Sequence, residues 1–167
     1  MVKDLPAGSK IKNLNLDDFG MEQALKQAHK AYAKNEVPIG AVILNKDGKI
    51  IARAYNQVEK KETQLAHAEL QVLHKATKKM KRWRLNDFTL YVTLQPCMMC
   101  MGAAILSRIS RIVYAANSPL FGCDLDKQEW CGIYKDSLPM IEFQERQEAI
   151  KLLKKFFIKQ RNIKNDC

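Results

Sequence analysis

The sequence predicts an α/β layered fold, because strand-like and helix-like segments alternate along its 167 residues. Apolar residues recur three and four positions apart, as in a helix, over residues 16–36, 66–80, 97–107 and 144–162. Short β-branched or apolar runs, typical of strands, lie at 39–45, 49–56, 88–94, 111–116 and 140–143. Strands alternating with helices favour a sheet that is largely parallel in its later part.

The chain begins with a segment that lacks such a pattern. Residues 1–16 are expected to form a loose N-terminal arm, and residues 17–167 a single domain, because no repeat or long linker interrupts them. Asp17 and Asp18 are candidates for capping the first helix, and Pro38 is expected to end it.

The next elements are defined by turn residues and prolines. Asp47 and Gly48 lie between the first two strand-like runs and predict a hairpin that pairs them antiparallel. Pro96 stops the strand that starts near residue 88 and can open the following helix. Residues 117–139 carry no regular pattern, and a short strand and a final helix follow them.

Composition restricts the class of protein. A hydrophobic fraction of 47% with 28% charged residues is ordinary for a soluble globular protein, and no apolar stretch approaches the length of about 20 residues that spans a bilayer. The first 20 residues lack the apolar run of a secretory signal, so a cytoplasmic location without membrane association is expected. Five cysteines in such a chain argue for metal binding or reactive thiols over a disulfide framework.

The charge of the chain favours a polyanionic partner. Its net charge is +10, and cations gather in "KKMKRWR" at residues 78–84 and along the final helix, where Lys159 and Arg161 lie. Phe156 and Phe157 beside them could stack on bases, although at least one is expected to pack in the core. A basic but merely solvated surface is the alternative interpretation.

The candidate site of chemistry combines two helix starts. Cys97 and Cys100 lie three residues apart, so both sulfurs can reach one ion, and His67 offers a third ligand at the start of the 66–80 helix. Three protein ligands leave a fourth zinc position open to water, whose pKa zinc lowers to about 7. Glu69 could then shuttle protons, although positions two apart diverge by roughly 200° around a helix. A structural zinc site or a redox cysteine pair remains the alternative.

Together these residues form the H-x-E and P-C-x-x-C signature of zinc nucleobase deaminases. With "EVPIGAV", "AHAE", "TLYVTLQPCMMCMGA" and "SRISRIVY", the sequence resembles the cytidine deaminase superfamily. Within it, the resemblance is closest to bacterial-type tRNA adenosine deaminases, which convert the wobble adenosine of certain tRNAs into inosine.

This resemblance implies a three-layer α/β/α fold with a five-stranded mixed sheet, a homodimer, and one zinc ion per chain on His67, Cys97 and Cys100. It implies that Glu69 is the catalytic proton shuttle and that the substrate is a tRNA anticodon loop. The residues implied to bind the target nucleoside are Asn56, Pro38, Leu94 and Ala68, and Ser118 lies in the loop implied to meet the RNA. The final helix adds Phe156, Phe157, Lys159 and Arg161 as candidates for RNA contact.

Two positions depart from the family pattern. Gln95 stands where family members commonly have Glu, and Ser118 stands where a loop acidic residue usually falls. A free-base or nucleotide deaminase of guanine or cytosine type therefore remains an alternative, which the basic final helix disfavours. A non-catalytic, zinc-stabilised RNA-binding module is a further alternative, and Glu69 argues against it.

Overall fold

A computed structural model describes residues 16–125 and 137–165 of the chain. Its sheet has the strand order β2-β1-β3-β4-β5, formed by β1 (Gly40–Asn45), β2 (Ile50–Tyr55), β3 (Phe88–Val92), β4 (Arg111–Tyr114) and β5 (Met140–Phe143). β1 pairs antiparallel with β2 and β3, whereas β3, β4 and β5 run parallel. The five-stranded mixed sheet is therefore confirmed. The expected arm up to residue 15, Cys131 and Cys167 lie outside the described residues.

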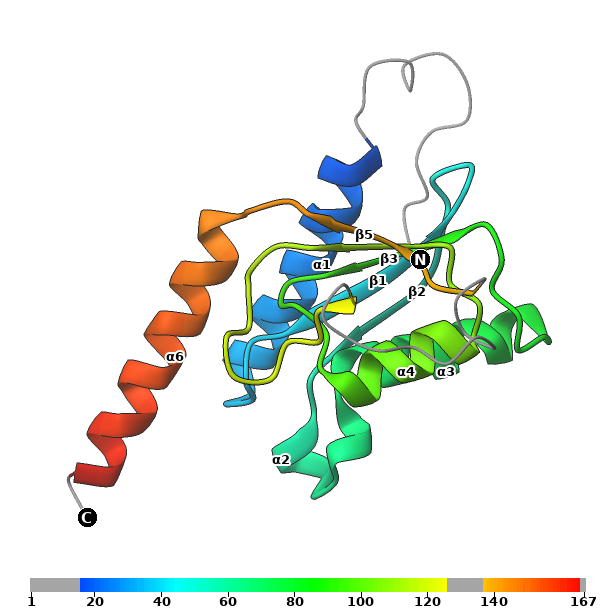
Figure 1. Cartoon of the computed structure of the whole chain (residues 1–167). Helices are drawn as coiled ribbons and strands as arrows, with labels where there is room; N and C mark the ends of the chain where they lie inside the picture. The colour runs from blue at the N-terminus through cyan, green and yellow to red at the C-terminus, as the bar shows by residue number, and fades with distance from the viewer. Residues whose placement is uncertain (1–15, 126–136, 166–167) are drawn as a thin grey trace.

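Helices cover both faces of this sheet (Figure 1). α1 (Leu16–Ala33) and α6 (Gln147–Asn165) lie on one face, and α3 (Ala68–Met80) and α4 (Met98–Leu106) lie on the other. Alternate side chains of β1 supply the two cores, since Ala41 and Ile43 pack with α3 and α4 while Val42 and Leu44 pack with α1. The three-layer α/β/α fold is thus confirmed.

The boundaries differ from the expected ones at several places. Asp17 and Asp18 lie inside the first turn of α1, so they do not precede the helix as caps, and α1 ends at Ala33, five residues before Pro38. The final helix begins at Gln147, three residues later than the sequence pattern indicated. Two short elements were not expected, namely α2 (Val58–Lys61) and the 3-10 turn η2 (Gln64–Ala66).

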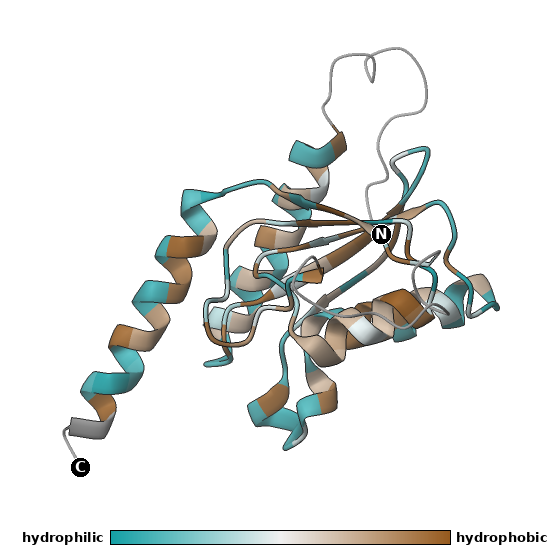
Figure 2. Cartoon of the chain, in the orientation of Figure 1, coloured by the Kyte–Doolittle hydropathy of each residue, from teal (hydrophilic) through white to brown (hydrophobic). Residues whose placement is uncertain are grey.

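The helices differ in how their apolar residues are distributed (Figure 2). α6 alternates hydrophilic and hydrophobic residues along its length, as expected of a helix with one covered face. α4, with the sequence MMCMGAAIL, contains no charged residue. No helix among the described residues is long and apolar enough to cross a membrane.

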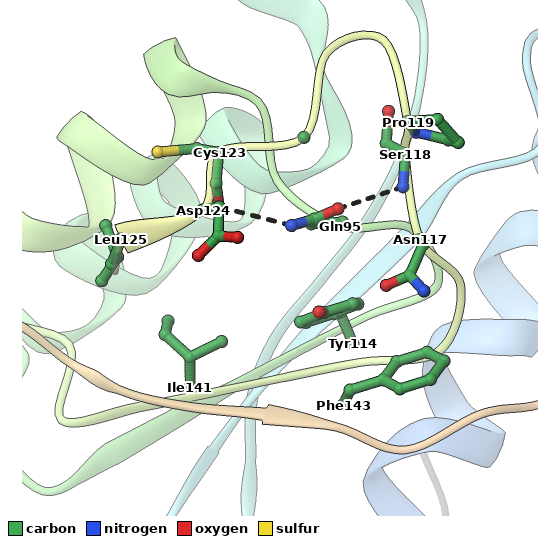
Figure 3. A pocket seen from close by; sticks show the side chains of 11 residues that line it. Gln95, Tyr114, Asn117, Ser118, Pro119, Cys123, Asp124, Leu125, Ile141 and Phe143 are labelled. Atoms are coloured by element: carbon green, nitrogen blue, oxygen red, sulfur yellow. Dashed lines mark hydrogen bonds between the residues drawn. The ribbon is translucent and has the colours of Figure 1, made fainter. Parts of the chain in front are cut away.

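The loop after β4 lies against the segment that follows β3. The Gln95 amide donates to the Ala116 carbonyl at 2.8 Å, and the Cys123 amide donates to the Pro96 carbonyl at 2.8 Å. Beside this loop, at the carboxyl ends of β4 and β5, lies a cavity of about 500 Å³ that Tyr114, Ile141 and Phe143 also line (Figure 3). The loop is therefore held by the same segment that leads into Cys97.

Asp17 connects α1 to the sheet. The Arg111 guanidinium donates to both of its carboxylate oxygens, at 2.6 and 2.8 Å, and the Tyr91 hydroxyl donates to one of them at 2.7 Å. The hydrogen bonds from Arg111 lower the pKa of Asp17 below its ordinary value of 3.8. Arg111 also binds Glu142 of β5, so the network joins α1, β3, β4 and β5.

We expect Asp17→Asn to reduce the free energy of unfolding at pH 7 by about 1 to 2 kcal/mol, because two charge-assisted hydrogen bonds are weakened at a half-buried site. A carboxyl whose pKa is lower in the folded state stabilises the fold above its unfolded pKa. The difference between the two proteins should therefore be constant near neutral pH and shrink as the pH falls below 3.8. Urea unfolding at several pH values measures it. Asp47→Asn, at an exposed turn position, is the matched control, and an equal loss there would contradict the expectation.

Candidate active site

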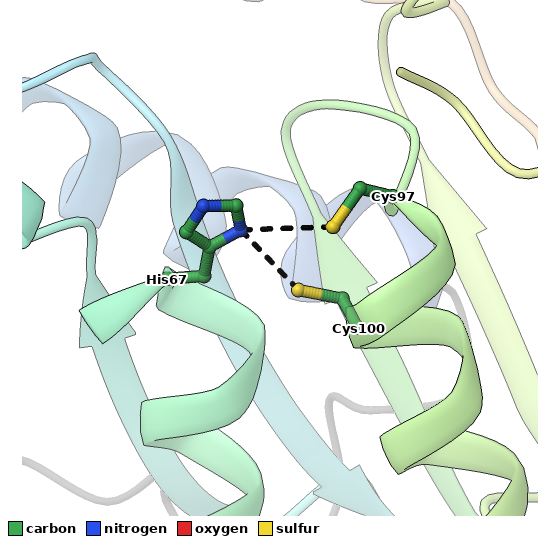
Figure 4. Close-up of side chains that lie close together, drawn as sticks. All are labelled: His67, Cys97 and Cys100. Atoms are coloured by element: carbon green, nitrogen blue, oxygen red, sulfur yellow. Dashed lines mark hydrogen bonds between the residues drawn. The ribbon is translucent and has the colours of Figure 1, made fainter. Parts of the chain in front are cut away.

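His67, Cys97 and Cys100 come together although they belong to different elements. His67 and Cys97 are the residues directly before α3 and α4, and Cys100 lies in the first turn of α4. The Nδ1 atom of His67 lies 3.8 Å from the Cys97 sulfur and 3.4 Å from the Cys100 sulfur (Figure 4). One ligand atom from each residue lies within 4.8 Å of the other two. The three side chains therefore form a group able to hold one metal ion.

One thiolate of this group is available to a cation at neutral pH, whereas His67 and Cys100 retain their protons. Hydrogen bonds from Cys100 and His67 lower the pKa of the Cys97 thiol to about 4, and the hydrogen bond to Cys97 raises the pKa of His67. The pKa of Cys100 is raised by its hydrogen bond with Cys97 and by burial. A divalent cation would displace the remaining protons and relieve the repulsion between two adjacent thiolates.

Gln64 of η2 orients the His67 ring. Its side-chain oxygen lies 3.2 Å from Nε2 of His67, so Nε2 carries the proton and donates it to the amide oxygen. Once a cation replaces the proton shared with the sulfurs, this arrangement leaves Nδ1, the atom that faces both of them, as the electron-pair donor.

Glu69 lies beside this group in a buried position. Its side chain is 3% exposed, and its Oε2 atom has no hydrogen-bond partner among the described residues. Burial raises the pKa of Glu69 to about 7, while interactions with His67 and Cys100 oppose that shift. His67 has extended backbone angles, with φ −54° and ψ 145°, so it lies outside the helix. Its side chain and that of Glu69 are therefore not forced to opposite sides of a helix, as two helical positions two apart would be. A buried carboxyl with one oxygen that lacks a hydrogen-bond partner thus accompanies the three side chains.

Asn56 is held by a residue that the sequence patterns did not single out. Its amide nitrogen donates to Glu36 at 3.3 Å, and Glu36 also accepts from the backbone amides of Glu59 at 3.1 Å and Lys60 at 2.8 Å. Glu36 is 2% exposed and Asn56 is 3% exposed. An acidic residue two positions before Pro38 was the available signal, but nothing in the sequence indicates its three partners.

Comparison with known proteins places this geometry in a family. Residues 16–165 match the profile of the MafB19-like deaminases. The chain belongs to this deaminase family. The resemblance to tRNA adenosine deaminases is confirmed by curated relatives. The tRNA-specific adenosine deaminase of Bacillus subtilis (strain 168) is 50% identical over 64% of this chain and 66% of its own length. That of Buchnera aphidicola subsp. Schizaphis graminum is 41% identical over 86% of this chain and 95% of its own length.

Solved structures agree with this assignment. A structure from a study of A-to-I editing by tRNA:A34 deaminases at the wobble position aligns with a TM-score of 0.69 and 36% identity, over 76% of this chain and 98% of that chain. A guanine deaminase from Bacillus subtilis aligns with a TM-score of 0.59 and 28% identity, over 87% of this chain and 93% of that chain. The fold of the deaminase is therefore shared by enzymes with different substrates.

The three other residues predicted to contact the nucleoside lie at well-packed positions of the deaminase. Ala68 is fully buried at the start of α3 and belongs to the core under α3 and α4. Pro38 is buried in the segment before β1, and Leu94 is half-buried after β3, where it packs against the α1 side. Packing alone accounts for all three, so their contact with a nucleoside stays a prediction.

The aromatic pair of α6 is split between core and surface. Phe156 is 5% exposed and packs edge-on against Tyr32 with a centroid distance of 6.4 Å, which agrees with the expectation that at least one of the two phenylalanines packs in the core. Phe157 is 46% exposed. It lines a groove of about 720 Å³ together with Arg161, Lys34, Lys60 and Glu36, whereas Lys159 is exposed but does not line it. Ser118 lies in the loop after β4.

Proposed function

We propose that the protein is a zinc-dependent hydrolytic deaminase that converts adenosine to inosine at the wobble position of a tRNA anticodon. The observation that carries this proposal is the buried carboxyl of Glu69, one oxygen of which has no hydrogen-bond partner among the described residues, next to a group of three metal-binding side chains. A closed structural site needs four ligands and no free acid. The names of the curated relatives support tRNA adenosine as the substrate.

The donor set fits zinc. One imidazole nitrogen and two thiolates are ligands that zinc prefers, and the tautomer fixed by Gln64 presents the correct nitrogen. His67, Cys97 and Cys100 would hold one ion per chain. Zinc bound there supplies an activated water at neutral pH.

Glu69 performs the proton transfers in this proposal. It takes a proton from the attacking water and delivers it to N1 of the purine. It then takes the proton of the new C6 hydroxyl and passes it to the amine, which leaves as ammonia as the C6 carbonyl forms. A carboxyl with a pKa of about 7 can both accept and donate a proton near neutral pH. Asn56, whose amide is fixed by Glu36, orients the nucleoside.

The charge and the groove beside α6 support RNA as the substrate. The chain carries a net charge of +10, and the groove combines the exposed ring of Phe157 with the cations Arg161, Lys34 and Lys60. Cations neutralise phosphates and an exposed ring stacks on unpaired bases. Because tRNA is the substrate, we place the enzyme in the cytoplasm.

The surface of α4 supports a homodimer. Met98, Met99 and Leu106 are 50%, 38% and 57% exposed on a helix without a single charged residue (Figure 2). A helix that is apolar on its exposed side favours burial against another surface. Sedimentation equilibrium should therefore give twice the mass of one chain, and a monomer at micromolar concentration would contradict this part of the proposal.

The test measures bound zinc and product formation on three substrates: a tRNA anticodon stem-loop with adenosine at the wobble position, free guanine, and free cytosine. We expect zinc at one equivalent per chain and inosine from the stem-loop alone. Deamination of guanine or cytosine without inosine formation would establish the free-base alternative. Zinc and RNA binding without any deamination would establish the non-catalytic module.

Glu36→Gln tests how Asn56 is oriented. A glutamine keeps one acceptor oxygen but adds a donor that faces other donors, so the hydrogen bonds to Asn56 and to the amides of α2 cannot all persist. We expect kcat/KM for the stem-loop to fall about tenfold or more while zinc stays bound. Glu22→Gln, on the exposed face of α1, is the control and should leave kcat/KM unchanged. Unaltered kinetics of Glu36→Gln would disprove this role.

A further inference from the structure

The side chain of Gln95 bridges two points of the loop that follows β4. Its Oε1 atom accepts from the Ser118 amide at 3.1 Å, and its Nε2 atom donates to the Cys123 carbonyl at 3.4 Å (Figure 3). The Ser118 amide can only donate and the Cys123 carbonyl can only accept. A side-chain amide, with one acceptor atom and one donor atom, satisfies both, whereas a carboxylate has no donor for the carbonyl.

The backbone around this bridge leaves little freedom. Gly122 forms an isolated antiparallel bridge with Cys97, and its amide donates to the Ser118 carbonyl at 2.8 Å. A Cβ atom on Gly122 would collide with the side chain of Gln95 and with the Ser118 carbonyl. The loop therefore packs directly on Gln95 and on the strand-like segment that presents Cys97.

The tip of the loop that Gln95 bridges exposes two large apolar side chains. Leu120 is 85% exposed and Phe121 is 74% exposed, and these are the two most exposed large apolar side chains of the described residues. Phe121 directly precedes Gly122, the residue paired with Cys97. An exposed aromatic ring next to the site of chemistry suits unpaired bases, which stack on such rings in single-stranded RNA.

We propose that Gln95 is a positioning residue that fixes this loop so that Leu120 and Phe121 meet the nucleotides next to the target base. The inference rests on the proposed function, because the partner is the RNA loop that carries the target. It also explains the departure from the family pattern, since glutamate at this position could not hold the Cys123 carbonyl. The hydrogen bonds of the Gln95 side chain go to the backbone of the loop, so Gln95 acts through the loop.

The test replaces Gln95 by Met, which has a similar length but forms neither bond. We expect KM for the anticodon stem-loop to rise about tenfold, from the loss of two hydrogen bonds, with kcat within about twofold and zinc content unchanged. Discrimination against stem-loops with altered nucleotides beside the wobble adenosine should weaken. Gln95→Glu should also be impaired. Gln147→Met, the same change at an exposed position of α6, is the control and should match the wild type.

An activity-independent readout separates this inference from the proposed function. Hydrogen exchange of the peptide covering residues 117–123 should accelerate in Gln95→Met and not in Gln147→Met, because the Ser118 amide loses its acceptor. Wild-type exchange and KM in Gln95→Met would overturn the inference, as would impairment of Gln95→Glu alone, which would indicate charge repulsion. If the wild type forms no inosine, the proposed function fails, and the exchange rates still decide whether Gln95 holds the loop.

Discussion

Glu69→Gln should retain one equivalent of zinc and lose inosine formation by about 10³-fold or more, since a general acid–base contributes typically 10² to 10⁴ and Glu69 serves several proton transfers. The glutamine side chain has the same size in this buried position, but its amide cannot accept and release a proton. Single-turnover kinetics with the stem-loop measures the chemical step directly.

The control for this prediction is Glu62→Gln. Glu62 is exposed at the end of α2, seven positions from Glu69 in sequence, and should tolerate the change. Two results on Glu69→Gln would contradict the proposed role. Loss of zinc would make Glu69 a ligand, and unchanged inosine formation would show that another group moves the protons.

His67→Ala should lose both the metal and the activity. Two thiolates without the imidazole leave an incomplete ligand set, and without the ion no group lowers the pKa of water from 15.7 toward 7. We expect substoichiometric zinc after dialysis and inosine formation reduced by at least about 10³-fold. Elemental analysis and the stem-loop assay measure the two quantities.

His74→Ala is the matched control, because His74 is exposed on α3, the helix that His67 precedes, and belongs to no metal-binding group of the described residues. It should keep zinc and activity. Full zinc occupancy in His67→Ala would remove His67 from the ligand set, and equal loss in both variants would point to damage of α3 as a whole.

The fold could be predicted where a local pattern decides the structure. The β-branched runs and the Asp47–Gly48 turn gave the hairpin, and the apolar periodicities gave α1, α3, α4 and α6. The pairing of β1 with β3 could not be predicted, since it joins strands about 45 residues apart through long-range packing. α2 was missed because it buries no residue and therefore has no apolar pattern.

The candidate site, like the fold, could be predicted only where a local pattern decides the structure. The grouping of His67, Cys97 and Cys100 with Glu69 beside them could be predicted, because the signature concentrates these residues at two helix starts. Their relative geometry depended on one backbone feature, the extended angles of His67, which no residue pattern reports. The roles of Glu36 and Gln95 could not be predicted from the sequence, for a different reason. Their roles consist of hydrogen bonds to backbone groups more than 20 residues away, and a backbone group leaves no trace in the sequence.

The stability of α2 and the position of Asn56 both depend on Glu36. α2 is four residues long, has no side-chain cap of its own and buries none of its residues, so it cannot persist alone. The Glu36 carboxylate binds two of its first amides and the Asn56 side chain at once. We therefore expect α2 and Asn56 to open and close together as one cooperative unit. Transient opening of that unit would remove the proposed nucleoside contact of Asn56 while His67, Cys97 and Cys100 stay in place, so warming should weaken substrate affinity before the fold is lost.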